Sequence, residues 1–205
     1  MLKIRAEQFK TVNRVERIKK VVTARQECVV VLEDIYDPHN AEAVFRSCDA
    51  FGVQKVCLIF EHEKKFNPRK VGKSTSSSAN KWLDFMSYDS TEMCLSKLKT
   101  EGYTIIATAF TPDAVSLYES DISSLAKPVL MFGNEHRGLS EKAVELADIK
   151  IIIPMRGFVQ SLNLSVTAAI CMYELTRQRI TAKNMNKSLL SVEEQKKLYD
   201  ELIKK

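Results

Sequence analysis

The amino-acid sequence predicts an α/β protein with a mostly parallel sheet and helices on both faces. Short continuous runs of apolar residues alternate along the chain with segments in which apolar residues recur every three or four positions. The continuous runs are typical of strands buried on both sides, as in a parallel sheet. Strands that alternate with helices form such sheets. A chain of 205 residues is long enough for one domain of this kind with appendages.

The expected elements follow one another in order. Strands are expected at residues 29–32, 56–60, 103–110, 129–132 and 149–154. Helices are expected at residues 5–22, 38–51, 91–99, 140–147, 162–181 and from residue 191 onward. Asp37 followed by Pro38 marks a helix start, because Asp caps free N–H groups and Pro suits the first turn. Ser191 and Glu194 have the spacing of a capping box.

Several common functions are excluded by missing motifs. No GxGxxG fingerprint is present, and the P-loop-like segment 133–140 has Leu139 where the lysine should be. The five cysteines form no CxxC pair and share no ligand spacing with the three histidines, so we expect neither a metal site nor a disulfide framework. No apolar run approaches the roughly 20 residues of a membrane span. The N-terminus has no signal-peptide pattern. A cytoplasmic location is expected.

Charge is concentrated at the two ends of the chain. The net charge is +5, but residues 1–25 hold eight basic and two acidic side chains, and residues 175–205 hold eight basic and four acidic ones. Residues 61–80 form a further basic loop around Asn67 and Pro68. Such runs can be solvated helix faces. Two basic ends on one chain favour a polyanionic partner, because Lys and Arg displace phosphate counterions.

Polar side chains follow three of the expected strands. The pairs are Asn40 with Arg46, Asn134 with Glu135, and Ser161 with Asn163. In open parallel sheets, ligands bind beyond the carboxyl ends of the strands. Each pair alone could be a cap beside a surface residue, but three such loops indicate a site.

Three motifs, in a fixed order along the chain, identify the family that this sequence resembles. Residues 38–53 contain Pro-His-Asn, then Arg46 and Gly52-Val53; residues 129–139 contain Gly-Asn-Glu and Gly138-Leu139; and residues 152–166 contain Gln160 to Val166 in the order Gln-Ser-Leu-Asn-Leu-Ser-Val. Together they resemble the SpoU/TrmH branch of the SPOUT RNA 2′-O-ribose methyltransferases. The chain departs from the family's His-Lys-Trp segment, where Asn80 stands in place of the His.

The resemblance implies properties that spacing alone does not give. It implies a deep trefoil knot in the C-terminal part, S-adenosylmethionine as cofactor, and a homodimer with its active site near the interface. It divides the chain into a basic helical extension (1–25), a methyltransferase domain (26–180) and a second basic helical extension (181–205). The short extensions favour tRNA as the partner, at guanosine 18 of the D-loop. The alternatives are ribosomal RNA and the tRNA anticodon loop.

The resemblance also implies roles for particular residues. The expected catalytic residues are Arg46, Asn40, Glu135, Ser161 and Asn163. The expected cofactor contacts are Thr108, Gly133, Ile153 and Leu162. From the basic segments we expect RNA contacts at Arg5, Lys10, Arg14, Arg17, Lys64, Lys65, Arg69 and Lys70.

Two readings of Arg46 remain open. The resemblance proposes it as the base that takes the 2′-hydroxyl proton or as a phosphate-linked activator. An arginine is protonated below about pH 12, which favours the interpretation that Arg46 pairs with a phosphate and itself stabilises the developing alkoxide. Two rivals from other classes are a non-catalytic RNA-binding factor on this fold and a small-molecule α/β enzyme; the latter leaves both basic ends unexplained.

Overall fold

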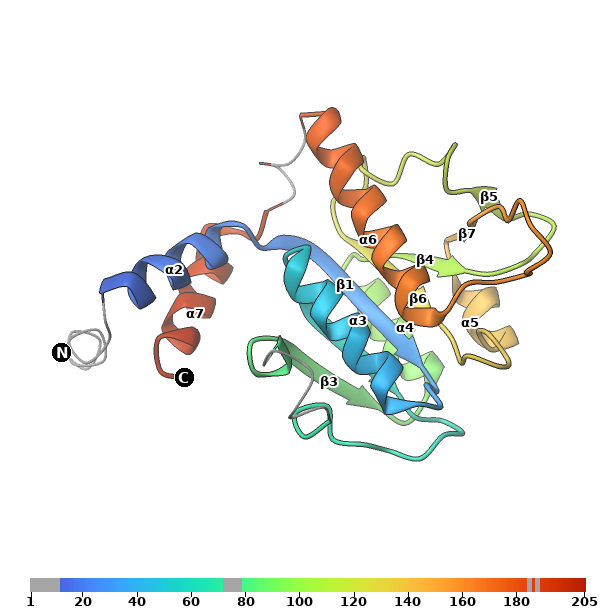
Figure 1. Cartoon of the computed structure of the whole chain (residues 1–205), viewed down its shortest axis with the longest axis horizontal. Coiled ribbons are helices and arrows are strands. Elements are labelled where there is room, and N and C mark those ends of the chain that lie inside the picture. The colour runs from blue at the N-terminus through green and yellow to red at the C-terminus, as the bar shows by residue number, and fades with distance from the viewer. Residues whose placement is uncertain (1–11, 72–78, 184–185, 187–188) are drawn as a thin grey trace.

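The computed structural model describes residues 12–71, 79–183, 186 and 189–205, and Figure 1 shows their arrangement. A seven-stranded sheet has the order β3-β2-β1-β6-β4-β7-β5. Every pairing between neighbouring strands is parallel, as predicted. The strands are β1 (Gln26–Glu33), β2 (Val53–Ile59), β3 (Asp84–Tyr88), β4 (Thr104–Thr108), β5 (Val115–Ser116), β6 (Pro128–Phe132) and β7 (Ile149–Ile152).

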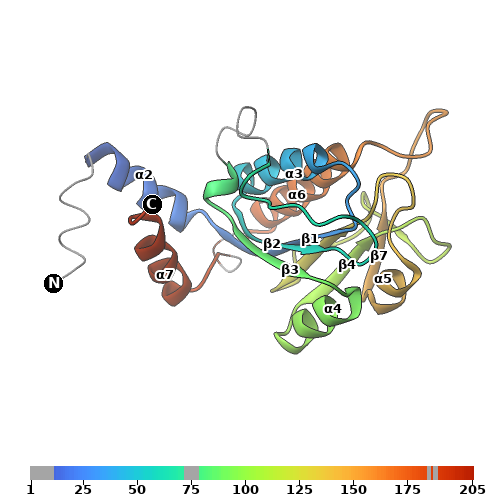
Figure 2. The same cartoon turned by 90° about the horizontal axis from the view of Figure 1, so that it is seen from below.

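Helices cover both faces of this sheet (Figure 2). Helices α3 (Pro38–Ala50) and α6 (Leu164–Thr181) lie on one face, and α4 (Thr91–Thr100) and α5 (Glu141–Leu146) lie on the other. Every residue of β1 is buried. Val30 and Leu32 pack into the α3–α6 core, whereas Val29 and Val31 pack into the α4–α5 core. This division explains the continuous apolar run, since each side chain of the strand has a helix layer to face.

A third apolar cluster joins the two ends of the chain. Helices α2 (Val12–Thr23) and α7 (Val192–Leu202) pack side by side at one end of the molecule, beyond the sheet (Figure 1). Ile18 and Val22 of α2 meet Leu198 and Leu202 of α7, with Trp82 against the cluster. Each helix is amphipathic and too short to be stable alone in water, so the two bury each other's apolar face. The boundaries at residues 25 and 180 stay predictions.

The structure corrects several element boundaries. The long helix begins at Leu164 and not at residue 162, because the side chain of Asn163 caps it by accepting from the Ser165 N–H. The expected caps Asp37 and Ser191 are confirmed, the second with a full capping box. Strands β3 and β5 were not predicted. The first is a half-buried edge strand, and the second has only two residues.

Buried polar side chains tie the end of α6 to the start of β1. Arg179 is fully buried and donates to Gln26 Oε1 at 2.8 Å, to the Glu27 carbonyl at 3.1 Å and to the Leu125 carbonyl at 3.4 Å. Burial lowers the pKa of Arg179 from its ordinary value. These three bonds supply oxygen acceptors with a donor, and the bonds to Gln26 and Glu27 are buried. No helix among the described residues is long and apolar enough to cross a membrane.

Candidate active site

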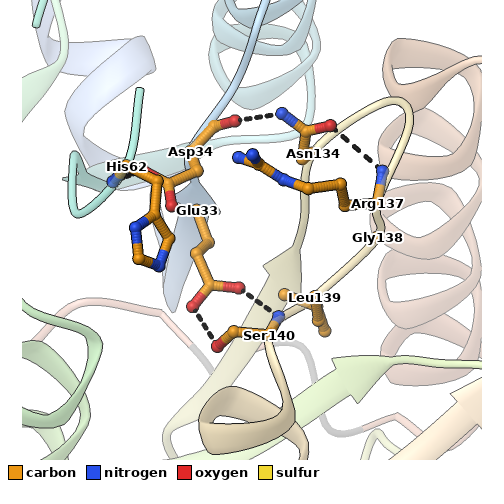
Figure 3. A pocket seen from close by; sticks show the side chains of 8 residues that line it. All are labelled: Glu33, Asp34, His62, Asn134, Arg137, Gly138, Leu139 and Ser140. Carbon is orange, nitrogen blue, oxygen red and sulfur yellow. Dashed lines mark hydrogen bonds between the residues drawn. The ribbon is translucent and has the colours of Figure 1, made fainter. Parts of the chain in front are cut away.

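The loops that follow β1 and β6 are joined at the carboxyl edge of the sheet. The amide of Asn134 donates to the Asp34 carbonyl at 2.7 Å (Figure 3). Its oxygen accepts from the backbone N–H groups of His136 and Arg137 at 2.8 and 3.1 Å. A Cβ on Gly133 would lie 2.3 Å from the Gly138 carbonyl carbon, so only glycine permits this tight turn. Asn134 therefore fixes both loops in one arrangement.

Glu135 projects from this turn and receives three hydrogen bonds. Its Oε2 accepts from the Tyr36 N–H at 2.8 Å. Its Oε1 accepts from the Asp37 N–H at 3.2 Å and from Asn40 Nδ2 at 2.8 Å. Hydrogen bonds to an ionised carboxylate are among the stronger ones in proteins. The carboxylate holds the start of α3 against the 133–138 turn.

Asn40 extends the network to the third polar loop. Its Oδ1 accepts from Asn163 Nδ2 at 3.1 Å, and the Asn163 oxygen accepts from both the N–H and the hydroxyl of Ser165. Glu135 accepts from one end of the Asn40 amide and Asn163 donates to the other, so its orientation is fixed by partners on both sides. Three of the five expected catalytic residues thus form one chain of hydrogen bonds, drawn from loops after β1, β6 and β7.

The other two expected catalytic residues, Arg46 and Ser161, come from α3 and from the segment before α6. Arg46 is exposed on α3, about 9 Å along the helix axis from Asn40 at 1.5 Å per residue. Ser161 is exposed two residues before Asn163 and is not part of the hydrogen-bonded chain. Capping of α6, the alternative role for Ser161, is performed by Asn163.

The expected cofactor residues come from three strands that are neighbours in the sheet. Gly133 follows β6, Thr108 ends β4, and Ile153 follows β7; the sheet order places β4 between the other two. Thr108 Oγ1 donates to the Met131 carbonyl at 3.0 Å, which ties β4 to β6. Leu162 is half-buried directly before the Asn163 cap. Gly133, Thr108 and Ile153 therefore lie along one stretch of the carboxyl edge.

The expected RNA contacts lie in two places. Arg14 and Arg17 are on α2, while Arg5 and Lys10 lie outside the described residues. Lys64, Lys65, Arg69 and Lys70 are exposed in the loop after β2. Two of these loop residues have protein partners: Lys65 pairs with Asp89, and the Arg69 guanidinium lies 5.6 Å from the centre of the Phe85 ring.

A hollow that the sequence did not predict lies beside the 133–138 turn (Figure 3). It measures about 360 Å³ and is lined by Glu33, Asp34, His62, Asn134, Arg137, Gly138, Leu139 and Ser140. Glu33 is buried and accepts from the N–H and hydroxyl of Ser140 at 2.8 and 2.7 Å. Asp34 has a positive φ of 50°, and its Oδ1 accepts three backbone N–H groups of residues 61–63. Both carboxylates thus support the loops around the hollow.

The fold and the network together define a parallel α/β protein with a candidate ligand site at the carboxyl edge of the sheet, beside the Glu135–Asn40–Asn163 network. Residues 27–173 match the model of the SpoU rRNA methylase family. The chain belongs to this family, which confirms the resemblance carried by the three motifs.

Relatives and a solved structure match almost the whole chain. A tRNA (guanosine(18)-2′-O)-methyltransferase of Aquifex aeolicus is 35% identical over 93% of this chain and 91% of its own length. The protein of the same name from Thermus thermophilus is 36% identical over 96% of this chain and 98% of its own. The crystal structure of the A. aeolicus TrmH/SpoU tRNA modifying enzyme superposes with a TM-score of 0.82 at 34% identity, covering 93% of this chain and 95% of that one.

Proposed function

We propose that this protein methylates the ribose 2′-hydroxyl of guanosine 18 in the D-loop of tRNA, with S-adenosylmethionine as methyl donor. The observation that carries the proposal is the extent of the match. The A. aeolicus and T. thermophilus relatives named for this reaction align over 93% and 96% of the chain. That extent includes most of both terminal extensions, the feature that favours tRNA over ribosomal RNA. Five unpaired, buried cysteines fit the cytoplasm, where thiols stay reduced.

The residues at the ends of β6, β4 and β7 fit the proposed cofactor. Gly133 leaves no space for a side chain where the loop doubles back, and it follows β6, the neighbour of the strand that ends at Thr108. Ile153 and Leu162 offer apolar surface suited to an adenine ring, and loop backbone groups offer polar contacts. When bound, S-adenosylmethionine supplies a methyl group that carries its own leaving group. The protein therefore has to orient the hydroxyl and assist loss of its proton.

The Glu135–Asn40–Asn163 network supplies orientation. Because Asn40 is held from both sides, it can position the ribose or the Arg46 side chain without rearrangement, and fixed geometry of this kind removes a large part of a reaction barrier. Arg46 carries a guanidinium, a planar cation whose N–H donors suit phosphate oxygens. We assign it to a phosphate of the substrate and to the alkoxide that develops on the ribose. Ser161, in the segment before α6, is proposed to join this group.

The basic side chains provide RNA affinity. Arg14 and Arg17 on α2 and the lysines and arginine of residues 64–70 are proposed to contact phosphates, together with Arg5 and Lys10. Phosphate contacts position an RNA without reading its sequence. Selection of one nucleotide then depends on tRNA shape and on extrusion of the target nucleotide.

A second copy of the chain is the proposed occupant of the outer face of α3 and α6. A groove of about 420 Å³ runs between these helices, lined by Ala43, Ser47, Phe51, Ser165, Val166, Ala169, Ile170 and Tyr173. Val166 and Tyr173 are 45% and 56% exposed there. The groove borders the catalytic network at Ser165, consistent with a homodimer whose active sites lie near the interface. The deep trefoil knot of the C-terminal part belongs to the same proposal.

The test uses purified protein, an unmodified tRNA transcript and S-adenosylmethionine labelled on its methyl group. The expected product carries label on the ribose of guanosine 18. Label on another nucleotide of the tRNA would confirm a methyltransferase but assign it a different target. Salt-sensitive tRNA binding without methyl transfer or cofactor uptake would favour a non-catalytic RNA-binding factor.

A further inference from the structure

Two aromatic rings stand beside the Glu135 network without belonging to the core. Tyr36 and His136 lie in edge-to-face contact, with ring centres 5.3 Å apart and planes inclined at 70°. Tyr36 is 63% exposed, and His136 is exposed as well. The described chain has other edge-to-face pairs, such as Phe45 with Phe85, but Phe45 is fully buried. An aromatic pair stabilises a fold mainly through the area it buries, so the Tyr36–His136 pair contributes little to folding.

The backbone holds both rings in place. The Tyr36 N–H donates to Glu135 Oε2 at 2.8 Å, and the His136 N–H donates to Asn134 Oδ1 at 2.8 Å. Asn134 in turn donates to the Asp34 carbonyl, so the two loops that carry the rings are bonded directly to each other (Figure 3). Because these anchors are backbone groups and neighbouring side chains, the rings themselves remain available to a ligand.

We propose that Tyr36 and His136 form a stacking platform for an unstacked nucleobase of the RNA substrate, next to the ribose that is methylated. A planar base can stack with one face on the first ring. The second ring, inclined at 70° to the first, can then contact the edge of that base. Proteins that read single-stranded or extruded nucleotides stack the bases on Tyr, His, Phe or Trp side chains. The platform adjoins Glu135, which accepts from both the Tyr36 N–H and the Asn40 amide. This inference rests on the proposed function, since it takes RNA as the substrate.

The test compares side-chain variants that leave the backbone anchors intact. Tyr36→Ala removes the ring but keeps the N–H that Glu135 accepts. Tyr36→Phe and Tyr36→Trp keep a stacking face. Tyr118→Ala is the matched control, because Tyr118 is 69% exposed and follows β5 at the far edge of the sheet. The tRNA dissociation constant, the KM for tRNA at saturating S-adenosylmethionine, the cofactor affinity and the melting temperature are measured for each protein.

Loss of base–aromatic stacking corresponds to about a 5- to 150-fold loss of affinity. We expect Tyr36→Ala to raise the KM for tRNA within this range, with His136→Ala acting in the same direction. Cofactor affinity and melting temperature should stay unchanged, and the Phe and Trp variants should stay within about threefold of wild type. A Tyr36→Ala enzyme with wild-type affinity for tRNA would overturn the proposal. Equal losses in Tyr36→Phe and Tyr36→Ala would also overturn it, since they would assign the effect to the hydroxyl.

The binding measurement separates this inference from the proposed function. Wild-type protein that binds tRNA without methylating it would refute the proposed reaction, while the Tyr36 variants would still test stacking. Methylation of tRNA with no effect of Tyr36→Ala would refute the platform alone.

Discussion

Replacement of Glu135 tests whether its hydrogen bonds organise the site. Glu135→Ala removes the acceptor of three bonds, from the Tyr36 N–H, the Asp37 N–H and Asn40 Nδ2. In Glu135→Gln, the amide oxygen can still accept the two bonds that Oε1 accepts, from the Asp37 N–H and from Asn40 Nδ2. The amide NH₂ replaces Oε2, so the bond from the Tyr36 N–H is lost. A bond to a charged group contributes about 1.5–3 kcal/mol. Because Glu135 is half-buried and water can replace lost partners, the lower end of this range applies.

The two variants should therefore differ in a graded way. One lost bond of about 1.5 kcal/mol lowers kcat about tenfold in Glu135→Gln, and three lower it about 10³-fold in Glu135→Ala. The assay is methyl transfer to tRNA at saturating S-adenosylmethionine, with Glu141→Ala as a control that removes a nearby exposed carboxylate from the first turn of α5. Equal activities of the Gln and Ala variants would refute the reasoning, as would a wild-type rate in Glu135→Ala.

Three further predictions concern other parts of the molecule. Arg46→Ala should abolish methyl transfer and spare S-adenosylmethionine binding, measured by calorimetry; an equal loss of cofactor affinity would contradict the assignment. Arg179→Met removes the donor of three hydrogen bonds, two of them buried, and should lower the free energy of unfolding in urea by about 3 kcal/mol or more. A change below about 1 kcal/mol would count against the role given to this arginine. Burial raises the pKa of Cys28 and Cys171 from 9.0 to about 12, so these thiols stay protonated at pH 8. Because all five cysteines are buried, thiol titration of native protein should find none of them reactive until urea is added. Rapid labelling of the native protein would contradict the packing.

The fold was predictable wherever local patterns decide structure. The apolar runs around Val30 and Leu130 predicted two central strands, because a strand buried on both faces must be apolar throughout. Asp37 and Ser191 predicted helix starts, because capping depends on neighbours in sequence. Strand β3 was missed because its residues, including Asp84 and Ser87, lie at a half-buried edge and lack the apolar continuity of the interior strands.

Contacts between residues far apart in the sequence were not predictable from local patterns. The hydrogen bonds that join Asn40, Glu135 and Asn163 depend on β1 lying beside β6 in the sheet. Strand order cannot be derived from the periodicity of apolar residues. The family motifs selected these residues, and the structure brings them together. The mutual packing of α2 and α7 and the Tyr36–His136 contact likewise depend on tertiary arrangement. The start of α6 was placed two residues early because Asn163, not Ser161, provides the cap.

The most direct test of the central claim compares two tRNA molecules that differ only in one hydroxyl group. One carries guanosine at position 18, and the other carries 2′-deoxyguanosine there. Methyl transfer from labelled S-adenosylmethionine is measured on both under identical conditions. The account predicts about one methyl group per intact tRNA and none on the deoxy-substituted tRNA, with equal binding of both. Equal labelling of the two molecules would contradict it, because the methyl group would then be entering at another position.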